Sequence, residues 1–281
     1  TSASPNSSPS SSNPGMNAPL TAETITAGST PVGPVLLVAD LVKSYGGPII
    51  LRGVAFEAHA GVSLAVIGAN GSGKSTLLKC LIRLTDPTSG KITMLGKDVG
   101  ALNNRDLRRF RSRVGVVWQK HNLVPRTSAL SNVLHGVQSR LSGPRSWWQW
   151  AATDAVRAEA MACLARVGLA DKALQRVDSL SGGQQQRVAI ARMLMQRPEI
   201  VLADEPDASL DPQSGEDVMR LLSDLARQDG LTLIVISHRL EHTLEFSDRI
   251  LGLAGGQITL DVATTKADPV KLRCFFDKPT E

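Results

Sequence analysis

The sequence predicts an α/β fold in which a mainly parallel sheet is flanked by helices. Short apolar runs recur along the chain and are followed directly by small or polar residues. Segments with apolar residues at helical spacing separate these runs. Strands buried on both faces give continuous apolar runs, and their alternation with helices is typical of a parallel sheet. Ligands of such folds bind beyond the carboxyl ends of the strands, so we expect the functional residues there.

The composition limits the classes of function. The chain has 281 residues, a formal net charge of +5 and an aromatic content of 4%. Basic residues that bind nucleic acid usually lie beside aromatic stacking platforms, so we expect no nucleic-acid partner. Cys80, Cys163 and Cys274 are far apart, which argues against a disulfide scaffold or a zinc site and fits a reducing compartment. No apolar run is long enough to span a bilayer, so work at a membrane would be peripheral.

Three regions differ in composition. Residues 1–33 are rich in Ser, Pro, Asn and Thr and hold few large apolar side chains, so they are predicted to be a disordered tail. Residues 34–261 are expected to form the folded domain, with a helical subdomain at about 120–196. Residues 262–281 are weakly patterned and are interpreted as a C-terminal tail.

A small antiparallel β subdomain is predicted ahead of the main sheet. Strand candidates at residues 35–38, 49–51 and 54–56 are separated by turn-forming residues. Tyr45, the one tyrosine of the chain, lies between the first two. It either packs or lies on the surface as an ordinary tyrosine, or it stacks on the adenine ring of a nucleotide. Its position alone leaves both interpretations open.

A glycine-rich loop at residues 68–75 matches G-x-x-x-x-G-K-[S/T] at every fixed position, between an apolar strand at 62–67 and a helix at 76–82. The glycines let successive backbone N–H groups point at phosphate oxygens, and the helix N-terminus adds partial positive charge. Lys74 is expected to reach the β- and γ-phosphates, and the Ser75 hydroxyl to bind Mg²⁺. The residues expected to contact the nucleotide are Gly68, Asn70, Gly71, Gly73, Lys74, Ser75 and Thr76.

Strands at residues 92–95 and 113–117 enclose a basic helical segment, and Gln119 follows the second strand. From about 128 to 175 the pattern is mostly helical. Trp147, Trp148 and Trp150 cluster in this region. Core packing of a helical subdomain is favoured for them over an apolar surface for a partner.

A second anion-binding turn is predicted near residue 181. Ser181, Gly182, Gly183 and Gln184 open a helix, and the free N–H groups of a helix start bind anions. Further on, Asp211 followed by proline is a helix N-cap. A hairpin is predicted at about residues 250–260.

Polar side chains follow three predicted strands of the main sheet. The strand at about 200–204 ends in Asp204 and Glu205, the strand at 231–236 is followed by His238, and Gln119 follows the strand at 113–117. We expect these side chains to converge with the glycine-rich loop at one sheet edge. Asp204 suits a Mg²⁺ ligand and Glu205 suits the general base that deprotonates the attacking water. His238 can donate to the γ-phosphate, and Gln119 can hold Mg²⁺ or the water.

Together these motifs resemble the ATPase subunit of ABC transporters. The matching positions are residues 68–75, Gln119, residues 180–184, Asp204, Glu205, residues 209–211 and His238. The resemblance implies a P-loop NTPase fold of the ABC type that uses ATP and Mg²⁺. It also implies a head-to-tail homodimer in which Ser181, Gly182, Gly183 and Gln184 of one copy close over ATP bound to the other. Tyr45 would then stack on adenine, and Asp211 would lie at the dimer seam.

The same resemblance implies the partners and the location. The region after Gln119 would receive a helix of an integral membrane permease, which places the chain at the cytoplasmic face of the cell membrane. A periplasmic or lipid-anchored substrate-binding protein would be an indirect partner.

A narrower similarity is to phosphonate-importer ATPases. It rests on residues 122–124, 167–172, 175–176, 184–186 and 203–212. The chain departs from that pattern at residues 236–239 and at Trp118. The expected function is therefore import of phosphonate or a related phosphorus oxyanion. The alternatives are an importer of polar amino acids or methionine, an accessory ATPase of a soluble phosphonate-degrading complex, and a non-transport ABC protein acting on ribosomes or DNA.

Overall fold

The computed structural model describes residues 33–140 and 152–277, which belong to one unit, Pro31–Glu281. The predicted disordered tail lies outside the described residues except at Gly33, as do Trp147, Trp148 and Trp150. Within the described ranges, no helix is both long and apolar enough to cross a membrane.

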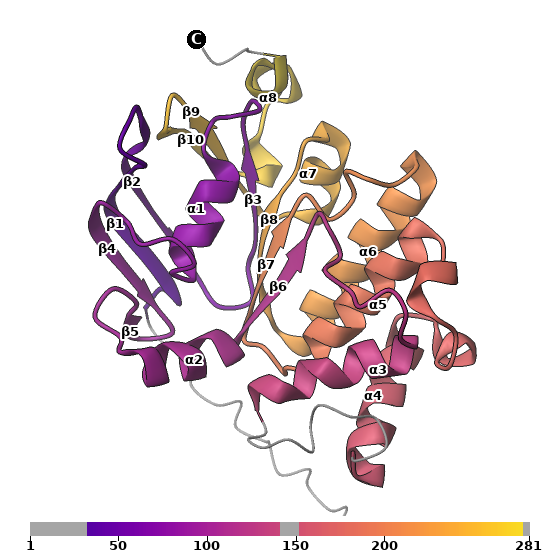
Figure 1. The fold of residues 1–281 in the computed structure, drawn as a ribbon. Helices are drawn as coiled ribbons and strands as arrows, with labels where there is room; N and C mark the ends of the chain where they lie inside the picture. The colour runs from indigo at the N-terminus through magenta and orange to yellow at the C-terminus, as the bar shows by residue number, and fades with distance from the viewer. Residues whose placement is uncertain (1–32, 141–151, 278–281) are drawn as a thin grey trace, which may run out of the picture. The chain divides into compact units, whose positions relative to one another are not determined.

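The larger of two sheets carries the predicted parallel strands (Figure 1). Its strand order is β10-β9-β3-β8-β7-β6; neighbouring strands from β9 to β6 run parallel, and β10 is antiparallel to β9. The strands are β3 (Ser63–Ile67), β6 (Val114–Trp118), β7 (Ile200–Asp204), β8 (Thr232–Ile236), β9 (Arg249–Ala254) and β10 (Gln257–Ala263). The mainly parallel sheet and the hairpin expected from the sequence are confirmed.

Two hydrophobic cores lie on opposite faces of this sheet. Val201 and Ala203 of β7 pack into the core that contains the helices α3 (Ala129–Leu134), α4 (Asp154–Arg166), α5 (Gly182–Leu194) and α6 (Pro212–Asp229). Ile200 and Leu202 pack into the core shared with the smaller sheet. Successive side chains of a strand point to opposite faces, so a strand covered on both sides must be apolar throughout. This explains the uninterrupted apolar runs that identified β3, β7 and β8 in the sequence.

The smaller sheet is antiparallel, with strand order β2-β1-β4-β5. Its strands are β1 (Leu36–Ser44), β2 (Ile49–Ala58), β4 (Ser89–Met94) and β5 (Lys97–Asp98). The sequence predicted two strands, at 49–51 and 54–56, where the structure has the single strand β2. Leu41 pairs with Val54 and Val42 pairs with Arg52, so Gly53 is left unpaired as a bulge with φ +75. The glycine bends one strand instead of ending it.

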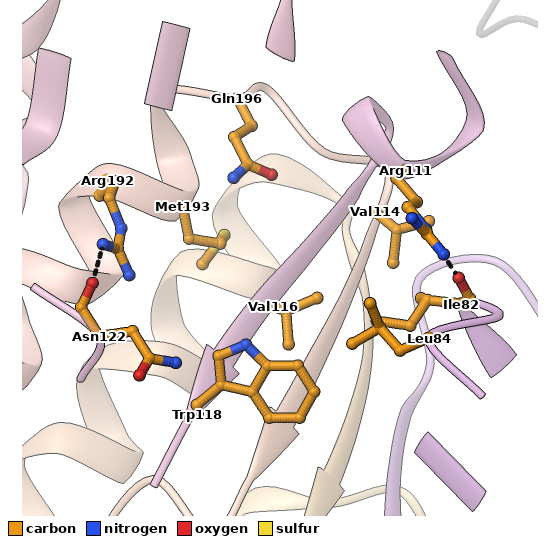
Figure 2. A pocket seen from close by; sticks show the side chains of 10 residues that line it. All are labelled: Ile82, Leu84, Arg111, Val114, Val116, Trp118, Asn122, Arg192, Met193 and Gln196. Atoms are coloured by element: carbon orange, nitrogen blue, oxygen red, sulfur yellow. Dashed lines mark hydrogen bonds between the residues drawn. The ribbon is translucent and has the colours of Figure 1, made fainter. Parts of the chain in front are cut away.

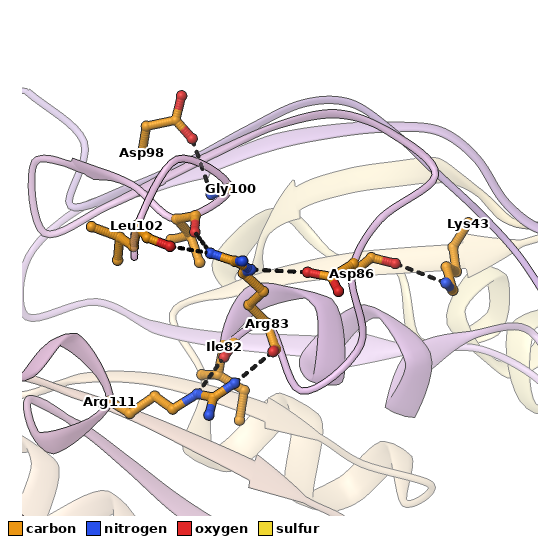
Figure 3. Close-up of polar contacts among 9 residues, drawn as sticks. Lys43, Ile82, Arg83, Asp86, Asp98, Gly100, Leu102 and Arg111 are labelled. Atoms are coloured by element: carbon orange, nitrogen blue, oxygen red, sulfur yellow. Dashed lines mark hydrogen bonds and ion pairs between the residues drawn. The ribbon is translucent and has the colours of Figure 1, made fainter. Parts of the chain in front are cut away.

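Two arginines join the smaller sheet to the main body (Figure 3). Arg111 of α2 (Asn104–Ser112) donates from Nε to the carbonyl oxygen of Ile82 at 2.9 Å, just beyond the end of α1 (Lys74–Leu81). Arg83 donates to the carbonyls of Val99 and Leu102 and pairs with Asp86 at 2.9 Å. The bonds of Arg111 satisfy carbonyls that the end of α1 leaves without helical partners, and those of Arg83 fix the loop that follows β5.

Most of the helices lie where the sequence predicts them. They are α1 (Lys74–Leu81), α2 (Asn104–Ser112), α3 (Ala129–Leu134), η1 (His135–Ser139), α4 (Asp154–Arg166), η4 (Ala170–Lys172), η5 (Val177–Ser179), α5 (Gly182–Leu194), α6 (Pro212–Asp229), α7 (Leu240–Phe246), η6 (Thr264–Lys266) and α8 (Pro269–Asp277). α3, α4 and α5 pack on one another within the range predicted as a helical subdomain, although its boundaries stay a prediction.

The last described residues differ from the weakly patterned tail expected at 262–281. β10 continues to Ala263, and α8 follows it. Leu272 of α8 is buried in a small third core with Ile67, Leu240 and Ile250. Phe275 and Phe276 pack against the same core, so the apolar residues of α8 stand at i, i+3 and i+4, a helical signal of one turn that the sequence prediction missed.

Candidate functional site

The loop between β3 and α1 is shaped by glycines and encloses Lys74. A Cβ added at Gly68 (φ +154) would lie 2.2 Å from the backbone oxygen of Leu253, so no larger residue fits there. Gly73, with φ +104, is the N-cap of α1. Lys74 is 4% exposed, and its Nζ donates to the carbonyls of Gly68 at 2.7 Å and Ala69 at 3.0 Å. The ammonium group is therefore held inside the curl of the loop.

The loop fits a phosphate group. Burial lowers the pKa of Lys74, and the nearby carboxylates of Glu205 and Asp204 act in the opposite direction. The Ser72 hydroxyl is buried and has no hydrogen-bond partner within the described part of the chain. A buried cation beside an unmatched donor, at the start of a helix, is a setting that favours an anion. Asn70, Gly71 and Thr76, also predicted to contact nucleotide, lie in the same loop and the first turn of α1.

Ser75 and Asp204 face each other across this site. Ser75 Oγ donates to Asp204 Oδ1 at 3.0 Å, which joins the first turn of α1 to the end of β7. Burial raises the pKa of Asp204, the hydrogen bond from Ser75 opposes this, and Glu205 adds to the rise. A hydroxyl and a carboxylate are oxygen ligands of the kind that hard divalent cations take. The described residues hold no cluster of three His, Cys, Asp or Glu side chains that could bind a metal alone.

Glu205 and His238 are in direct contact. His238 Nε2 and Glu205 Oε1 form a hydrogen bond that joins the loop after β7 to the loop after β8. Glu205 has φ +49, an uncommon conformation for a residue with a side chain, and its N–H donates to the Ile236 carbonyl at 3.2 Å. The structure thus brings together Lys74, Ser75, Asp204, Glu205 and His238, the side chains expected at the strand ends.

Gln119 follows β6, next to that group. β6 pairs in parallel with β7, with Trp118 opposite Asp204, so Gln119 lies one residue beyond the level of the carboxylate. Gln119 lines a cavity of about 400 Å³ together with Gln185 and Ser209.

The segment after Gln119 is hydrogen-bonded to Arg192, a residue that the sequence did not predict to have a role. Arg192, in the last turn of α5, donates to the carbonyls of His121 at 2.9 Å and Asn122 at 2.7 Å. Burial lowers the pKa of Arg192, which lacks a carboxylate partner in the described part of the chain. No sequence pattern marks Arg192 as a ligand of this segment, because its partners are backbone carbonyls about 70 residues away.

Ser181, Gly182, Gly183 and Gln184 begin α5. The Ser181 and Gln184 side chains form a reciprocal capping box. A Cβ added at Gly182 would lie 3.2 Å from Leu210, so this turn lies against the segment that leads to α6. Asp211 caps α6 there, and its carboxylate accepts from the Ser214 N–H at 3.0 Å.

The helix α5 packs against α3, α4 and α6, whereas α1 packs against β2 and β7 (Figure 1). Ser181 and Gly182 are exposed, as is Asp211. Within one chain, the structure therefore groups these residues on a surface of their own and not around Lys74.

Tyr45 lies in the turn between β1 and β2 and is 57% exposed. Lys43 Nζ lies 4.5 Å from the centre of its ring. An exposed ring is available for stacking, and the two interpretations of Tyr45 both remain compatible with this position.

A shallow groove of about 290 Å³ lies beside β6 (Figure 2). Trp118 and Val116 line it together with Leu84, which is 52% exposed. Arg192 and Asn122, joined by the hydrogen bond described above, close one side. The groove therefore borders the segment that Arg192 holds.

Comparison with known proteins identifies the family. A family model described as ABC transporter matches residues 51–208. The phosphite import ATP-binding protein PxtA of Stutzerimonas stutzeri is 46% identical over 244 residues, covering 86% of this chain and 87% of the relative. The phosphonates import ATP-binding protein PhnC of Frankia casuarinae is 46% identical over 228 residues, covering 81% of this chain and 90% of the relative.

Among solved structures, a dimeric post-hydrolysis state of the ATP-binding cassette MJ0796 bound to ADP and Pi is similar. Its TM-score is 0.71 at 32% identity, over 82% of this chain and 98% of that one. The fold, the loop that encloses Lys74 and these similarities agree with the family expected from the motifs. This chain belongs to the ABC transporter family, as one of its ATP-binding, ATP-hydrolysing cassettes.

Proposed function

We propose that this chain is the ATP-hydrolysing subunit of an importer for phosphonate or a related phosphorus oxyanion. The observation that carries the ATPase mechanism is the meeting of Lys74, the Ser75–Asp204 pair and the Glu205–His238 pair beyond the ends of β3, β7 and β8. The cargo class is supported by relatives of equal identity, one named for phosphite and one for phosphonates.

Lys74 and the loop around it bind the phosphates of ATP. When the nucleotide binds, the Lys74 ammonium exchanges the carbonyls of Gly68 and Ala69 for β- and γ-phosphate oxygens. The unmatched Ser72 hydroxyl supplies one more donor. This exchange gives anionic hydrogen-bond partners to a buried ammonium group that otherwise donates to neutral carbonyls.

Ser75, Asp204 and Gln119 are the residues that would hold Mg²⁺. At these residues the ion would supply positive charge to offset the negative charge of the phosphates. Asp204 is kept close to Ser75 in advance, so its carboxylate needs little rearrangement to bind a cation. A cation would also stabilise the ionised form that burial disfavours.

Glu205 accepts the proton of the attacking water, and His238 orients the Glu205 carboxylate. The contact between the two side chains holds the Glu205 carboxylate in one direction, and His238 can donate to the γ-phosphate from the same position. The left-handed backbone at Glu205 turns its side chain out of the line of β7.

A second copy of the chain completes the site. Ser181 and Gly182 are exposed at the start of α5, Gly183 follows them half-buried, and Gln184 fixes that turn through the capping box. We propose that these residues close over ATP bound to the partner copy, with Asp211 at the seam and Tyr45 stacked on adenine. The separation of α5 from α1 within one chain supports this arrangement.

The groove beside Trp118 is the proposed contact with an integral membrane permease. Its floor is apolar at Trp118 and Val116, and it borders the segment after Gln119. A docked helix would therefore contact a segment that leads directly to the nucleotide site. The chain would thereby lie at the cytoplasmic face of the cell membrane. A substrate-binding protein would deliver the cargo on the other side.

The cargo is tested by growth and by co-purification. In a strain that lacks this gene, growth on phosphite or a phosphonate as the sole phosphorus source should require the wild-type chain, and Glu205→Gln should not restore it. The tagged chain, extracted in detergent, should carry a permease and an oxyanion-binding protein identified by mass spectrometry. Normal growth of the deletion strain, or co-purification with soluble enzymes alone, would remove import of phosphorus oxyanions from the account.

Two variants test the chemistry. Lys74→Ala should lose ATP binding, measured by calorimetry, because the main cationic phosphate contact is gone. Glu205→Gln should bind ATP, lose turnover and accumulate an ATP-bound dimer in gel filtration. Unchanged affinity in the first variant, or near wild-type turnover in the second, would contradict the assigned roles.

A further inference from the structure

A second acid–histidine pair lies behind Glu205 and His238. Asp207 is 3% exposed and His242 is 5% exposed. His242 Nδ1 lies 2.8 Å from Asp207 Oδ2, so the imidazole donates to the carboxylate. Neither residue is among those that the sequence predicts to bind the nucleotide, the metal or the water.

The pair joins the same two segments as the catalytic contact. Asp207 lies two residues after Glu205 in the loop that follows β7, and His242 lies one helical turn after His238, on α7. Glu205–His238 and Asp207–His242 therefore form two successive cross-links from the β7–α6 connection, the first to the loop after β8 and the second to α7. Two links fix both the separation and the relative rotation of these segments, which a single link cannot do.

The surroundings of Asp207 leave it little room to move. Arg239 Nε lies 3.8 Å from the same carboxylate oxygen. A Cβ added at Gly215, in the first turns of α6, would lie 3.3 Å from Asp207 Cβ, so the helix packs closely on the acid. The loop adds its own bonds, from Ala208 N–H to Glu205 O and from Leu210 N–H to Asp207 O, both at 3.2 Å.

Glu205 needs such support because of its backbone. A non-glycine residue with φ +49 is held in a sparsely populated conformation, which persists where the surrounding structure over-determines it. Buried, fully partnered polar pairs are directional and resist displacement more than apolar contacts do. Catalytic groups depend on supporting side chains of this kind for their exact aim.

We propose that Asp207 and His242 are a positioning pair that holds Glu205 in the orientation needed to activate water. The proposal rests on the catalytic role of Glu205 given above. Both side chains are almost fully buried, so we expect them to contact neither the nucleotide nor the water, and their loss should lower the turnover rate and leave nucleotide binding intact.

The test measures kcat and KM for ATP hydrolysis by the purified full chain, with binding of ATP measured separately. His242→Leu removes the donor and should lower kcat by about tenfold or more while KM changes less than about twofold. His242→Asn keeps an N–H close to the position of Nδ1 and should retain most of the turnover. Glu245→Gln is the matched control on α7, because it breaks an exposed ion pair with Arg220 and should leave kcat unchanged.

A double variant separates positioning from folding. Asp207→Leu with His242→Leu removes the buried charge together with its partner, so the chain should fold even if His242→Leu alone does not. We expect the double variant to be folded, to bind ATP and to have the same low kcat. Wild-type kcat in the double variant, equal losses in His242→Leu and His242→Asn, or a loss confined to KM would overturn the proposal.

The same assay includes the wild-type chain and Glu205→Gln. An inactive wild-type chain, or an active Glu205→Gln, would mean that the proposed catalytic assignment fails. An active wild-type chain, an inactive Glu205→Gln and a fully active double variant would mean that only the positioning role fails.

Discussion

Replacement of Arg192 should loosen the segment after Gln119 from α5. The Arg192 guanidinium makes two hydrogen bonds to main-chain carbonyls, at 2.7 Å to Asn122 and at 2.9 Å to His121. Arg192→Met keeps a long apolar stem but removes both donors. Arg192→Lys keeps the charge, but an ammonium on a flexible stem cannot match the fork of the guanidinium.

The size of the effect follows from these two bonds. A hydrogen bond to a charged group contributes about 1.5–3 kcal/mol net. Water can reach part of the exposed 121–122 segment and replace some of the loss, so we take the lower end of the range and expect about 3 kcal/mol for both bonds. At about 2–4 °C per kcal/mol, Arg192→Met should lower Tm by about 6–12 °C. Arg192→Lys should fall between Arg192→Met and the wild type.

The assay combines thermal unfolding with ATP turnover. Arg109→Met is a control that removes an arginine whose side chain is 68% exposed and whose ion-pair distance to Asp106 is 3.8 Å, so it should leave Tm almost unchanged. Arg192→Met should also reduce kcat, because Gln119 lies two residues before the released segment. An Arg192→Met chain with the Tm and kcat of Arg109→Met would refute the reasoning.

Three further predictions concern the loop, the thiols and Asp204. Gly68→Ala places a carbon 2.2 Å from a backbone oxygen, so the loop must shift by about 1 Å and kcat for ATP hydrolysis should fall by about 100-fold. Wild-type turnover would contradict this geometry. Burial raises the pKa of Cys80 to about 11 and also raises the pKa of Cys163. At pH 8 a thiol reagent should therefore modify the exposed Cys274 alone in the native chain. Rapid reaction of a second thiol would be inconsistent with that burial. The folded-state pKa of Asp204 lies above its unfolded value, so the free energy of unfolding falls as the pH rises through the interval between the two values. Without metal or nucleotide, Asp204→Asn should therefore unfold at a higher temperature than the wild type at pH 7. A lower Tm for the variant would contradict the direction of this pKa shift.

The sequence predicts those features whose signal is local. β7 and β8 are found within a residue or two, because strands covered on both faces must be apolar throughout. The convergence of Asp204, Glu205 and His238 follows as well, because parallel strands end at one edge. The site roles of these residues remain predictions for the variants to test.

Features that depend on distant contacts are not visible in the sequence. The bond between Asp207 and His242 joins residues 35 positions apart, and no spacing rule relates them. Arg192 binds carbonyls, which every residue possesses, so nothing in the composition of 121–122 marks them as its partners. Gly53 was interpreted as a turn because glycine serves turns and bulges alike, and pairing with β1 decides between the two.

One rigid element connects the proposed dimer seam with the proposed permease groove. α5 begins at Gly182, beside the exposed turn that we expect to meet the partner's ATP, and Arg192 in its last turn holds the segment that borders the Trp118 groove. At 1.5 Å per residue, the distance along the helix from Gly182 to Arg192 is about 15 Å. Because a packed helix moves as a body, a displacement of its N-terminus by nucleotide must reach the groove unless the Arg192 bonds are absent. Arg192→Met should therefore reduce the stimulation of ATP hydrolysis by the permease more strongly than it reduces the basal rate of the isolated chain. An equal loss in both rates would show that coupling runs through other contacts.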